Sequence, residues 1–164
     1  MDSSVIEVVD LTEGAQVAEY ESNVVPPNSL VDELLDASKN YGDALICPER
    51  NSVGSAVIAI FRERQMLHLL VSEKKLDVKK GTKINRYGFH TTMATKSDIL
   101  FKLKEAIEEG DLVLRSRPLL RELRGYTSLQ LRDVRFDEEV SNHFDRVMAI
   151  AITNNMRFLV SGTS

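Results

Sequence analysis

Strand-like and helix-like segments alternate through the first half of this chain, and that alternation is the strongest constraint on its fold. Apolar residues recur at helical spacing from residue 30 until Tyr41 and Gly42 end the pattern. A strand built on the apolar run 44–46 is expected at 43–47, and a second helical pattern covers 52–64. Residues 67–72 (LHLLVS) then form another strand-like run. This order predicts an α/β fold in which part of the sheet is parallel.

An antiparallel β-hairpin is expected before this region. Residues 4–10 (SVIEVVD) are rich in β-branched types, and the LTEG that follows supplies a turn. Residues 14–24 form a second strand-like run, which Pro26 and Pro27 end. The hairpin and the parallel portion together predict a mixed sheet.

The second half of the chain contains a segment of different character. Residues 73–88 (EKKLDVKKGTKINRYG) are polar, basic and poor in apolar residues, which predicts a long exposed loop. Beyond it we expect helices at 95–109, 117–124 and 142–154, and strands at 112–115 and 128–136. With no internal repeat and no low-complexity linker, residues 1–164 are predicted to form a single domain.

Composition narrows the class of protein. Hydrophobic residues make up 43% of the chain and charged residues 28%, and no apolar run approaches the roughly 20 residues that span a bilayer. The N-terminus lacks the features of a secretory signal and Cys47 has no partner for a disulfide, which predicts a reducing, cytoplasmic setting. At a net charge of −4, nucleic-acid binding would depend on local basic groups and metal ions.

Glu49 is the first candidate for a functional side chain. It follows the strand expected at 43–47, and open α/β sheets bind ligands at the carboxyl ends of their parallel strands. It also precedes the helix expected at 52–64, where the helix dipole favours a solvated negative charge. Position alone leaves both interpretations open.

Asp145 is the second candidate, within the run SNHFDRVMAIAI. On a helix it shares a face with Met148 and Ile152, which is the face expected to meet the core. A carboxylate there requires a metal ion, a basic partner or the free amides of the first helical turn, so an N-terminal capping role is an equal alternative. His143 is a candidate proton carrier or outer ligand, although histidines at helix starts are common on surfaces.

Two carboxylates that face one cleft suit a hard divalent cation such as Mg²⁺ or Mn²⁺. Paired ions of this kind stabilise both the attacking and the leaving oxygen in phosphodiester cleavage. The HxxxH, CxxC and GxGxxG spacings are absent, so a zinc–thiolate site or a glycine-rich nucleotide loop has no support. Cys47 itself is most simply a small core residue.

Basic residues gather within 74–86 and within 115–124. Such groups usually mark solvated surface, but in a protein that cuts DNA they are the natural phosphate contacts. The residues predicted to contact DNA are Lys79, Lys80, Lys83, Arg86, Lys96, Arg115 and Arg117.

Four blocks occur in order along nearly the whole chain: ERNSVG (49–54), RYGFHTTMATKSDIL (86–100), EEGDLVLRSRPLLRELRGY (108–126) and HFDRVMAIAI (143–152). Together they resemble the C-terminal nuclease domain of phage large terminase subunits. The resemblance implies a ribonuclease-H-like fold, in which helices flank a mixed sheet, and cleavage of concatemeric viral DNA with two ions of Mg²⁺ or Mn²⁺ held by acidic residues. Glu49 matches the acid of the family's E-x-N block. Asp145 matches the last aspartate of its H-D-D block, with His143 in register.

The resemblance also implies partners and a location. The partners are double-stranded DNA, the terminase ATPase portion, the small terminase subunit and the portal protein. The location is the cytoplasm of a phage-infected or prophage-bearing bacterial cell, away from membranes.

The chain departs from the family pattern at two places. Phe144 stands where the family has an aspartate, and residues 1–164 contain no match to the family's first, central strand and its metal-binding aspartate or to its ATPase domain. Two alternatives follow from these departures. One is a fragment that binds DNA or packaging partners without cutting, and the other is a ribonuclease-H-like resolvase or transposase domain.

Overall fold

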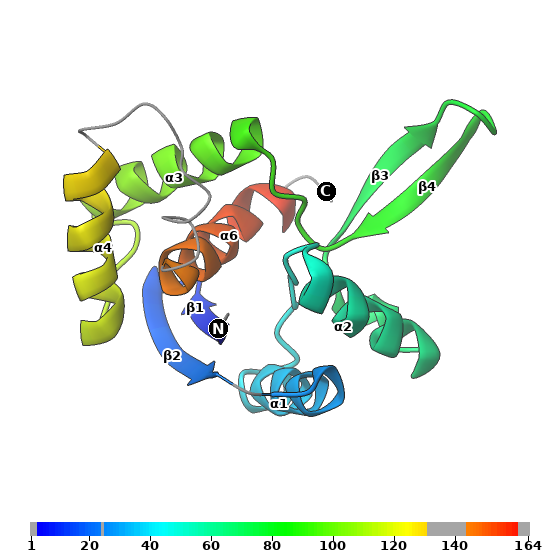
Figure 1. Cartoon of the computed structure of the whole chain (residues 1–164), viewed down its shortest axis with the longest axis horizontal. Helices are drawn as coiled ribbons and strands as arrows, with labels where there is room; N and C mark the ends of the chain where they lie inside the picture. Colours follow the sequence, from blue (N-terminus) through cyan, green and yellow to red (C-terminus); the bar gives the residue numbers. More distant parts are fainter. Residues whose placement is uncertain (1–2, 24, 131–143, 161–164) are drawn as a thin grey trace. The chain divides into compact units, whose positions relative to one another are not determined.

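The computed structural model describes residues 3–23, 25–130 and 144–160, and the chain divides into two compact units (Figure 1). The first unit comprises Met1–Val24 and Ser97–Arg157, and the second comprises Val25–Lys96 and Phe158–Ser164. The described residues contain five α-helices and two antiparallel sheets of two strands each, so the predicted α/β class is confirmed. The prediction of a single domain stays a prediction.

The predicted N-terminal hairpin is present in the first unit, as β1 (Ser4–Asp10) and β2 (Ala15–Ser22). Asp10 shapes its turn, because Oδ1 accepts hydrogen bonds from the backbone N–H groups of Thr12 (2.9 Å) and Glu13 (3.1 Å). Gly14 closes the turn with a φ of 66°, and a Cβ at this position would lie 2.3 Å from the carbonyl oxygen of Asp111. The turn therefore requires glycine.

Three helices complete the first unit: α3 (Met93–Glu108), which begins in the second unit, α4 (Arg117–Gln130) and α6 (Asp145–Val160). Val147, Ile150, Ala151 and Asn154 of α6 are fully buried, and their i, i+3, i+4, i+7 spacing defines one core-facing stripe. The core of this unit also includes Ile6, Ile99, Leu103, Leu112 and Leu119.

The second unit contains α1 (Pro27–Asn40), α2 (Ser52–Glu63), the short 3₁₀ helix η1 (Leu67–Leu69), β3 (Ser72–Asp77) and β4 (Thr82–Tyr87). Helix α1 starts with Pro27, whose fixed φ suits the first helical position. Val31 of α1 and Val57 and Phe61 of α2 are buried almost completely and form the centre of this unit's core.

Parallel pairing is much shorter than predicted. Within the part of the chain that the structure describes, it is limited to the single-residue bridges Ala15–Val113, Ile46–Leu70 and Glu49–Phe89. The expected strands at 43–47 and 112–115 therefore reduce to one bridging residue each. The expected strand at 67–72 is wrong for its first half, because α2 ends in a turn with Gln65 at φ 57° and the chain continues directly into η1.

The loop predicted at 73–88 is also wrong, because this segment forms the hairpin β3–β4. A strand is usually recognised in a sequence by apolar residues at every second position. The β3–β4 ladder lacks this pattern, because most side chains on both strands are exposed. Its turn is set by local chemistry. Asp77 Oδ1 accepts from the backbone N–H of Lys79 (3.0 Å), and Gly81 supplies a φ of 62°.

Two C-terminal elements differ from prediction in extent. Residues 128–130 belong to α4 rather than to the strand predicted at 128–136, and the rest of that segment lies outside the described residues. The helix predicted at 142–154 is described from Asp145 and runs on to Val160. Across the described ranges, no helix combines the length and the apolar character required to cross a membrane.

Candidate active site around Glu49

Two contacts fix the backbone of the segment ERNSVG: the N-cap of α2 and the close approach of Gly54 to the Glu49 carbonyl. Asn51 is the N-cap of α2, and its Oδ1 accepts from the backbone N–H of Gly54 at 2.8 Å. A Cβ on Gly54 would lie 1.7 Å from the carbonyl oxygen of Glu49, so the chain folds back here only because residue 54 is glycine. The asparagine and the glycine of the motif thus fix the backbone of the glutamate.

A second segment, around Phe89, holds the backbone on both sides of Glu49. The backbone N–H of Arg50 donates to the carbonyl of Phe89 (2.7 Å), and that of Phe89 donates to the carbonyl of Pro48 (2.8 Å). Gly88 permits this close approach, since a Cβ on it would lie 2.4 Å from the Pro48 oxygen. The blocks at 49–54 and 86–100, which are separate in sequence, therefore meet in the second unit.

The carboxylate of Glu49 is half-buried and held by neighbours from both blocks. Thr91 Oγ1 donates to its Oε1 at 2.5 Å, and Asn51 Nδ2 approaches its Oε2 at 3.4 Å. Lys96, in the first turns of α3, is only 9% exposed. Burial lowers the pKa of Lys96, while the nearby Glu49 carboxylate acts in the opposite direction. Sequence reasoning placed Lys96 among the DNA contacts and gave no signal of its position beside Glu49.

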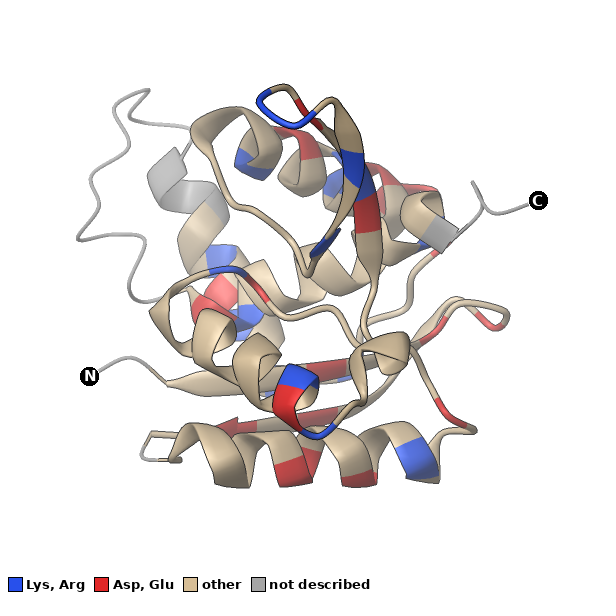
Figure 2. Cartoon of the chain, turned by 90° about the vertical axis from the view of Figure 1, so that its right-hand side faces the viewer, with Lys and Arg blue, Asp and Glu red and all other residues tan. Residues whose placement is uncertain are grey.

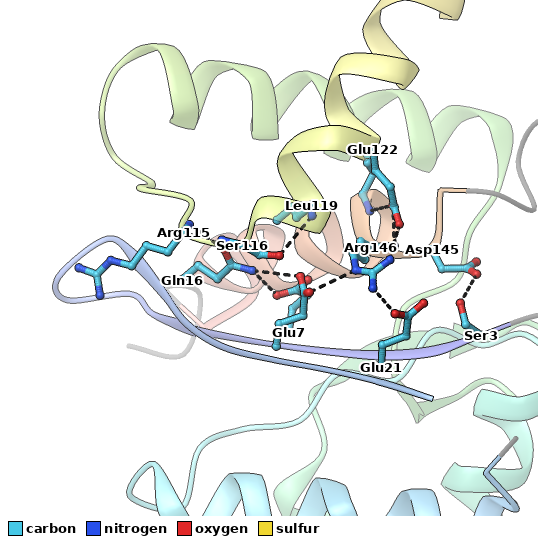
Figure 3. A network of polar contacts seen from close by, with 12 residues as sticks. Ser3, Glu7, Gln16, Glu21, Arg115, Ser116, Leu119, Glu122, Asp145 and Arg146 are labelled. Atoms are coloured by element: carbon cyan, nitrogen blue, oxygen red, sulfur yellow. Dashed lines mark hydrogen bonds and ion pairs between the residues drawn. The ribbon is translucent and has the colours of Figure 1, made fainter. Parts of the chain in front are cut away.

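Asp145 lies at the start of α6, where it accepts a hydrogen bond on Oδ2 from Ser3 Oγ at 2.9 Å (Figure 3). The amides of this helix start are instead capped by Glu122 of α4, whose Oε2 accepts from the backbone N–H groups of Arg146 (3.0 Å) and Val147 (3.2 Å). Glu122, a residue of another helix, thus caps two of the first amides of α6.

Phe144, which stands at the position of the family's aspartate, is a buried core residue. Its ring meets that of Tyr126 edge to face, with centroids 5.1 Å apart.

A cluster of charged side chains that the sequence did not indicate lies beside Asp145 (Figure 3). Arg146 forms ion pairs with Glu122 (2.9 Å), Glu19 (3.2 Å) and Glu21. Glu7 is buried in the same cluster and accepts from Gln16 Nε2 at 2.7 Å. Its pKa is raised to about 9, mainly by burial and then by Glu19, which faces it across the β1–β2 ladder.

Glu19 behaves in the opposite way. Burial opposes ionisation of Glu19, but hydrogen bonds with Glu7, Ser116 and Arg146 lower its pKa overall. Glu7 and Glu19 therefore hold one proton between them at neutral pH, and it lies on Glu7. An alternating hairpin would have predicted that these two glutamates share a face.

The remaining predicted residues are distributed as follows. Lys79, Lys80, Lys83 and Arg86 are exposed on the β3–β4 hairpin, and Arg115 and Arg117 are exposed in the first unit. His143 lies outside the described residues. Glu49 belongs to the second unit and Asp145 to the first, so each is described only within its own unit. In the described ranges, no three His, Cys, Asp or Glu side chains form a group that could hold a metal ion.

Comparison with known proteins gives no family for this chain: it matches no protein-family model and no curated protein sequence. The terminase resemblance therefore stays a prediction.

Proposed function

We propose that this chain is the nuclease domain of a viral DNA-packaging terminase, with a ribonuclease-H-like fold, and that it hydrolyses phosphodiester bonds of double-stranded DNA. The observation that carries the proposal is the construction around Glu49. Its carboxylate follows a parallel bridge, as ligand groups do in open α/β sheets, and Thr91, Asn51 and Lys96 surround it. The two sequence blocks that meet there are the first two blocks of the family resemblance.

The ions proposed for the site at Glu49 are Mg²⁺ or Mn²⁺. Carboxylate oxygens, together with the Thr91 hydroxyl, are the hard oxygen ligands that these cations prefer. In this proposal Glu49 and Asp145 hold the ions, together with the aspartate of the family's first strand. When bound, the ions activate water and stabilise negative charge on the phosphate oxygens.

The surrounding residues have distinct proposed roles. The Thr91 hydroxyl holds the Glu49 carboxylate in place through the 2.5 Å hydrogen bond to Oε1. Lys96 places a buried cation next to the carboxylate, where it offsets negative charge contributed by a DNA phosphate. His143 is proposed to carry a proton during the reaction.

The partners and the location are proposed on the resemblance. They are double-stranded DNA, the terminase ATPase portion, the small subunit and the portal protein, in the cytoplasm of the phage-bearing cell.

A plasmid-cleavage assay tests the proposal. The chain is incubated with supercoiled DNA and Mn²⁺, alone and with a polypeptide that supplies the family's first strand, and nicked and linear products are measured. We expect Glu49→Gln and Asp145→Asn each to lower the rate at least about a hundredfold, because a metal ligand is lost. Glu33→Gln changes an exposed acid of α1 and is the matched control, expected to cut at the wild-type rate. If neither mixture cuts, or if both ligand variants cut normally, the nuclease proposal is wrong.

A second candidate is a protein that binds DNA or packaging partners without cutting. The basic β3–β4 hairpin favours it, because phosphate contacts need no metal ion. Duplex binding without cleavage in both mixtures would support this candidate.

A further inference from the structure

The β3–β4 hairpin differs from the rest of the protein in charge. Residues 72–87 carry six basic and two acidic side chains, a net +4 in a chain whose total is −4. The two strands contact mainly each other, and Figure 1 shows them as an arm that extends away from α1 and α2. Figure 2 shows Lys and Arg along this arm and at its connecting turn. The arm is therefore a local positive surface on an acidic protein.

The register of the ladder separates the arm into two unlike faces, because directly paired residues project to the same side and alternate along each strand. We call one side the lysine face. Its residues are Ser72, Lys74, Leu76, Lys83, Asn85 and Tyr87. We call the other side the mixed face. Its residues are Glu73, Lys75, Asp77, Thr82, Ile84 and Arg86.

Charge is compensated on the mixed face only. Glu73 lies 3.9 Å from the Lys75 ammonium and is paired directly with Arg86 across the ladder. Asp77 adds a second acid to this side. The lysine face contains Lys74 and Lys83 and no acid, so its positive charge is not offset by residues of the same face.

The turn at the tip of the arm adds further positive charge. Lys79 and Lys80 occupy the turn, and both are exposed. Leu76, on the lysine face near the turn, is 62% exposed, and Val78 at the turn is 87% exposed. Exposed apolar side chains among lysines suit a groove of duplex DNA, where thymine methyl groups and sugars lie between two rows of phosphates.

We infer that the lysine face of β3–β4 is the surface on which duplex DNA lies. A two-stranded ribbon is narrow enough to enter the major groove, and Lys74, Lys83 and the turn lysines contact phosphates on its two sides. Asn85 projects from the same face with an amide able to contact a base edge. Arg86, predicted from sequence to contact DNA, projects from the mixed face opposite Glu73 and lies outside this surface.

The inference rests on the proposed function for its choice of partner, but its test is independent of cleavage. Binding of the full chain to a fluorescent 30-base-pair duplex is measured by anisotropy in EDTA, where no metal-dependent cutting occurs, at several salt concentrations. Lys74→Gln/Lys83→Gln is compared with Lys75→Gln/Arg86→Gln. Both double variants remove two positive charges from exposed positions of the same ladder, one from each face.

We expect the lysine-face variant to lose affinity about tenfold or more at 0.1 M salt and to lower the log–log salt slope by about two, since two phosphate contacts are lost. The mixed-face variant is expected to stay within about twofold of the wild type. Equal losses in the two variants would overturn the inference, because net charge alone would then explain binding. An unchanged affinity in the lysine-face variant would also overturn it.

A further arm distinguishes DNA from an anionic membrane, which also attracts lysines with apolar neighbours. Co-sedimentation with vesicles of phosphatidylcholine and phosphatidylserine is measured for the same proteins. A loss of vesicle binding in the lysine-face variant, with duplex binding unchanged, would assign the face to a membrane and refute our inference. Glu33→Gln, which changes an exposed acid of α1, is expected to bind duplex as the wild type does. Because binding is measured in EDTA, loss of binding is separable from loss of cleavage.

Discussion

Replacing Glu7 with glutamine is expected to stabilise the protein at neutral and alkaline pH. Glu7 is 8% exposed, and its pKa is raised from 4.5 to about 9, by burial first and by Glu19 second. A carboxyl group whose folded pKa is raised contributes stability below pH 4.5 and loses it as the pH rises through about 9, because the unfolded chain ionises first. The wild type should therefore become less stable over this range.

The size of the effect follows from the linkage between protons and folding. One proton changes the unfolding free energy by about 1.4 kcal/mol for each pH unit. Between pH 4.5 and pH 7 the loss assigned to Glu7 is thus about 3 kcal/mol. A glutamine keeps an acceptor for Gln16 Nε2 and a donor for Glu19, and it does not ionise.

Urea unfolding between pH 4.5 and pH 9 measures this difference directly. Glu7→Gln should match the wild type near pH 4.5 and exceed it by about 3 kcal/mol at pH 7. Glu33→Gln, at an exposed position of α1, should keep the wild-type pH dependence. A Glu7→Gln protein with the same pH dependence as the wild type, or with lower stability at pH 7, would refute the assignment of a shared proton to Glu7 and Glu19.

Three further outcomes are expected. Arg146→Met should lower the unfolding free energy by about 3 kcal/mol, because partly buried Glu19 and Glu122 lose their partner. Arg64→Met breaks an exposed pair with Asp32 and should lower it by less than about 1 kcal/mol. Urea titration distinguishes the two variants. Gly54→Ala should destabilise the protein by more than about 2 kcal/mol, since its Cβ would lie 1.7 Å from the Glu49 carbonyl oxygen. Gly125→Ala should not cause this loss, because its Cβ would approach only Phe144, at 3.7 Å. Thermal melts of the two variants test this difference. Cys47 should react slowly with a thiol reagent at pH 8 in the folded chain and rapidly in urea, because burial raises its pKa to about 12; equal rates would contradict this.

Local sequence signals predicted the regular elements well where one face is buried. The hairpin β1–β2 follows from β-branched residues around a turn that needs Gly14, and α1, α2, α3 and α6 follow from apolar spacing that matches their buried stripes. The β3–β4 hairpin was not predicted, because neither of its faces is buried and the alternating apolar pattern that identifies strands is absent. Its register then depends on turn chemistry at Asp77 and Gly81.

The surroundings of the two candidate acids could not be predicted in the same way. Glu49 and Asn51, the N-cap of α2, are only two residues apart in sequence, so their relation can be predicted from the motif. Thr91 and Lys96 reach Glu49 only through the Glu49–Phe89 bridge, and no local rule specifies a contact over such a separation. The same holds for Glu122, which caps α6 from another helix.

Iron-directed cleavage of the polypeptide is the most direct test of our proposal that Glu49 and Asp145 hold divalent ions in one site. Fe²⁺ that replaces Mg²⁺ produces hydroxyl radicals with ascorbate and peroxide, and these radicals cut the backbone close to the ion. Mass spectrometry should locate cuts near both residue 49 and residue 145. Excess Mg²⁺ or the Glu49→Gln substitution should suppress both sets of cuts. Cuts near only one of the two residues, or cuts that persist in Glu49→Gln, would contradict a shared metal site.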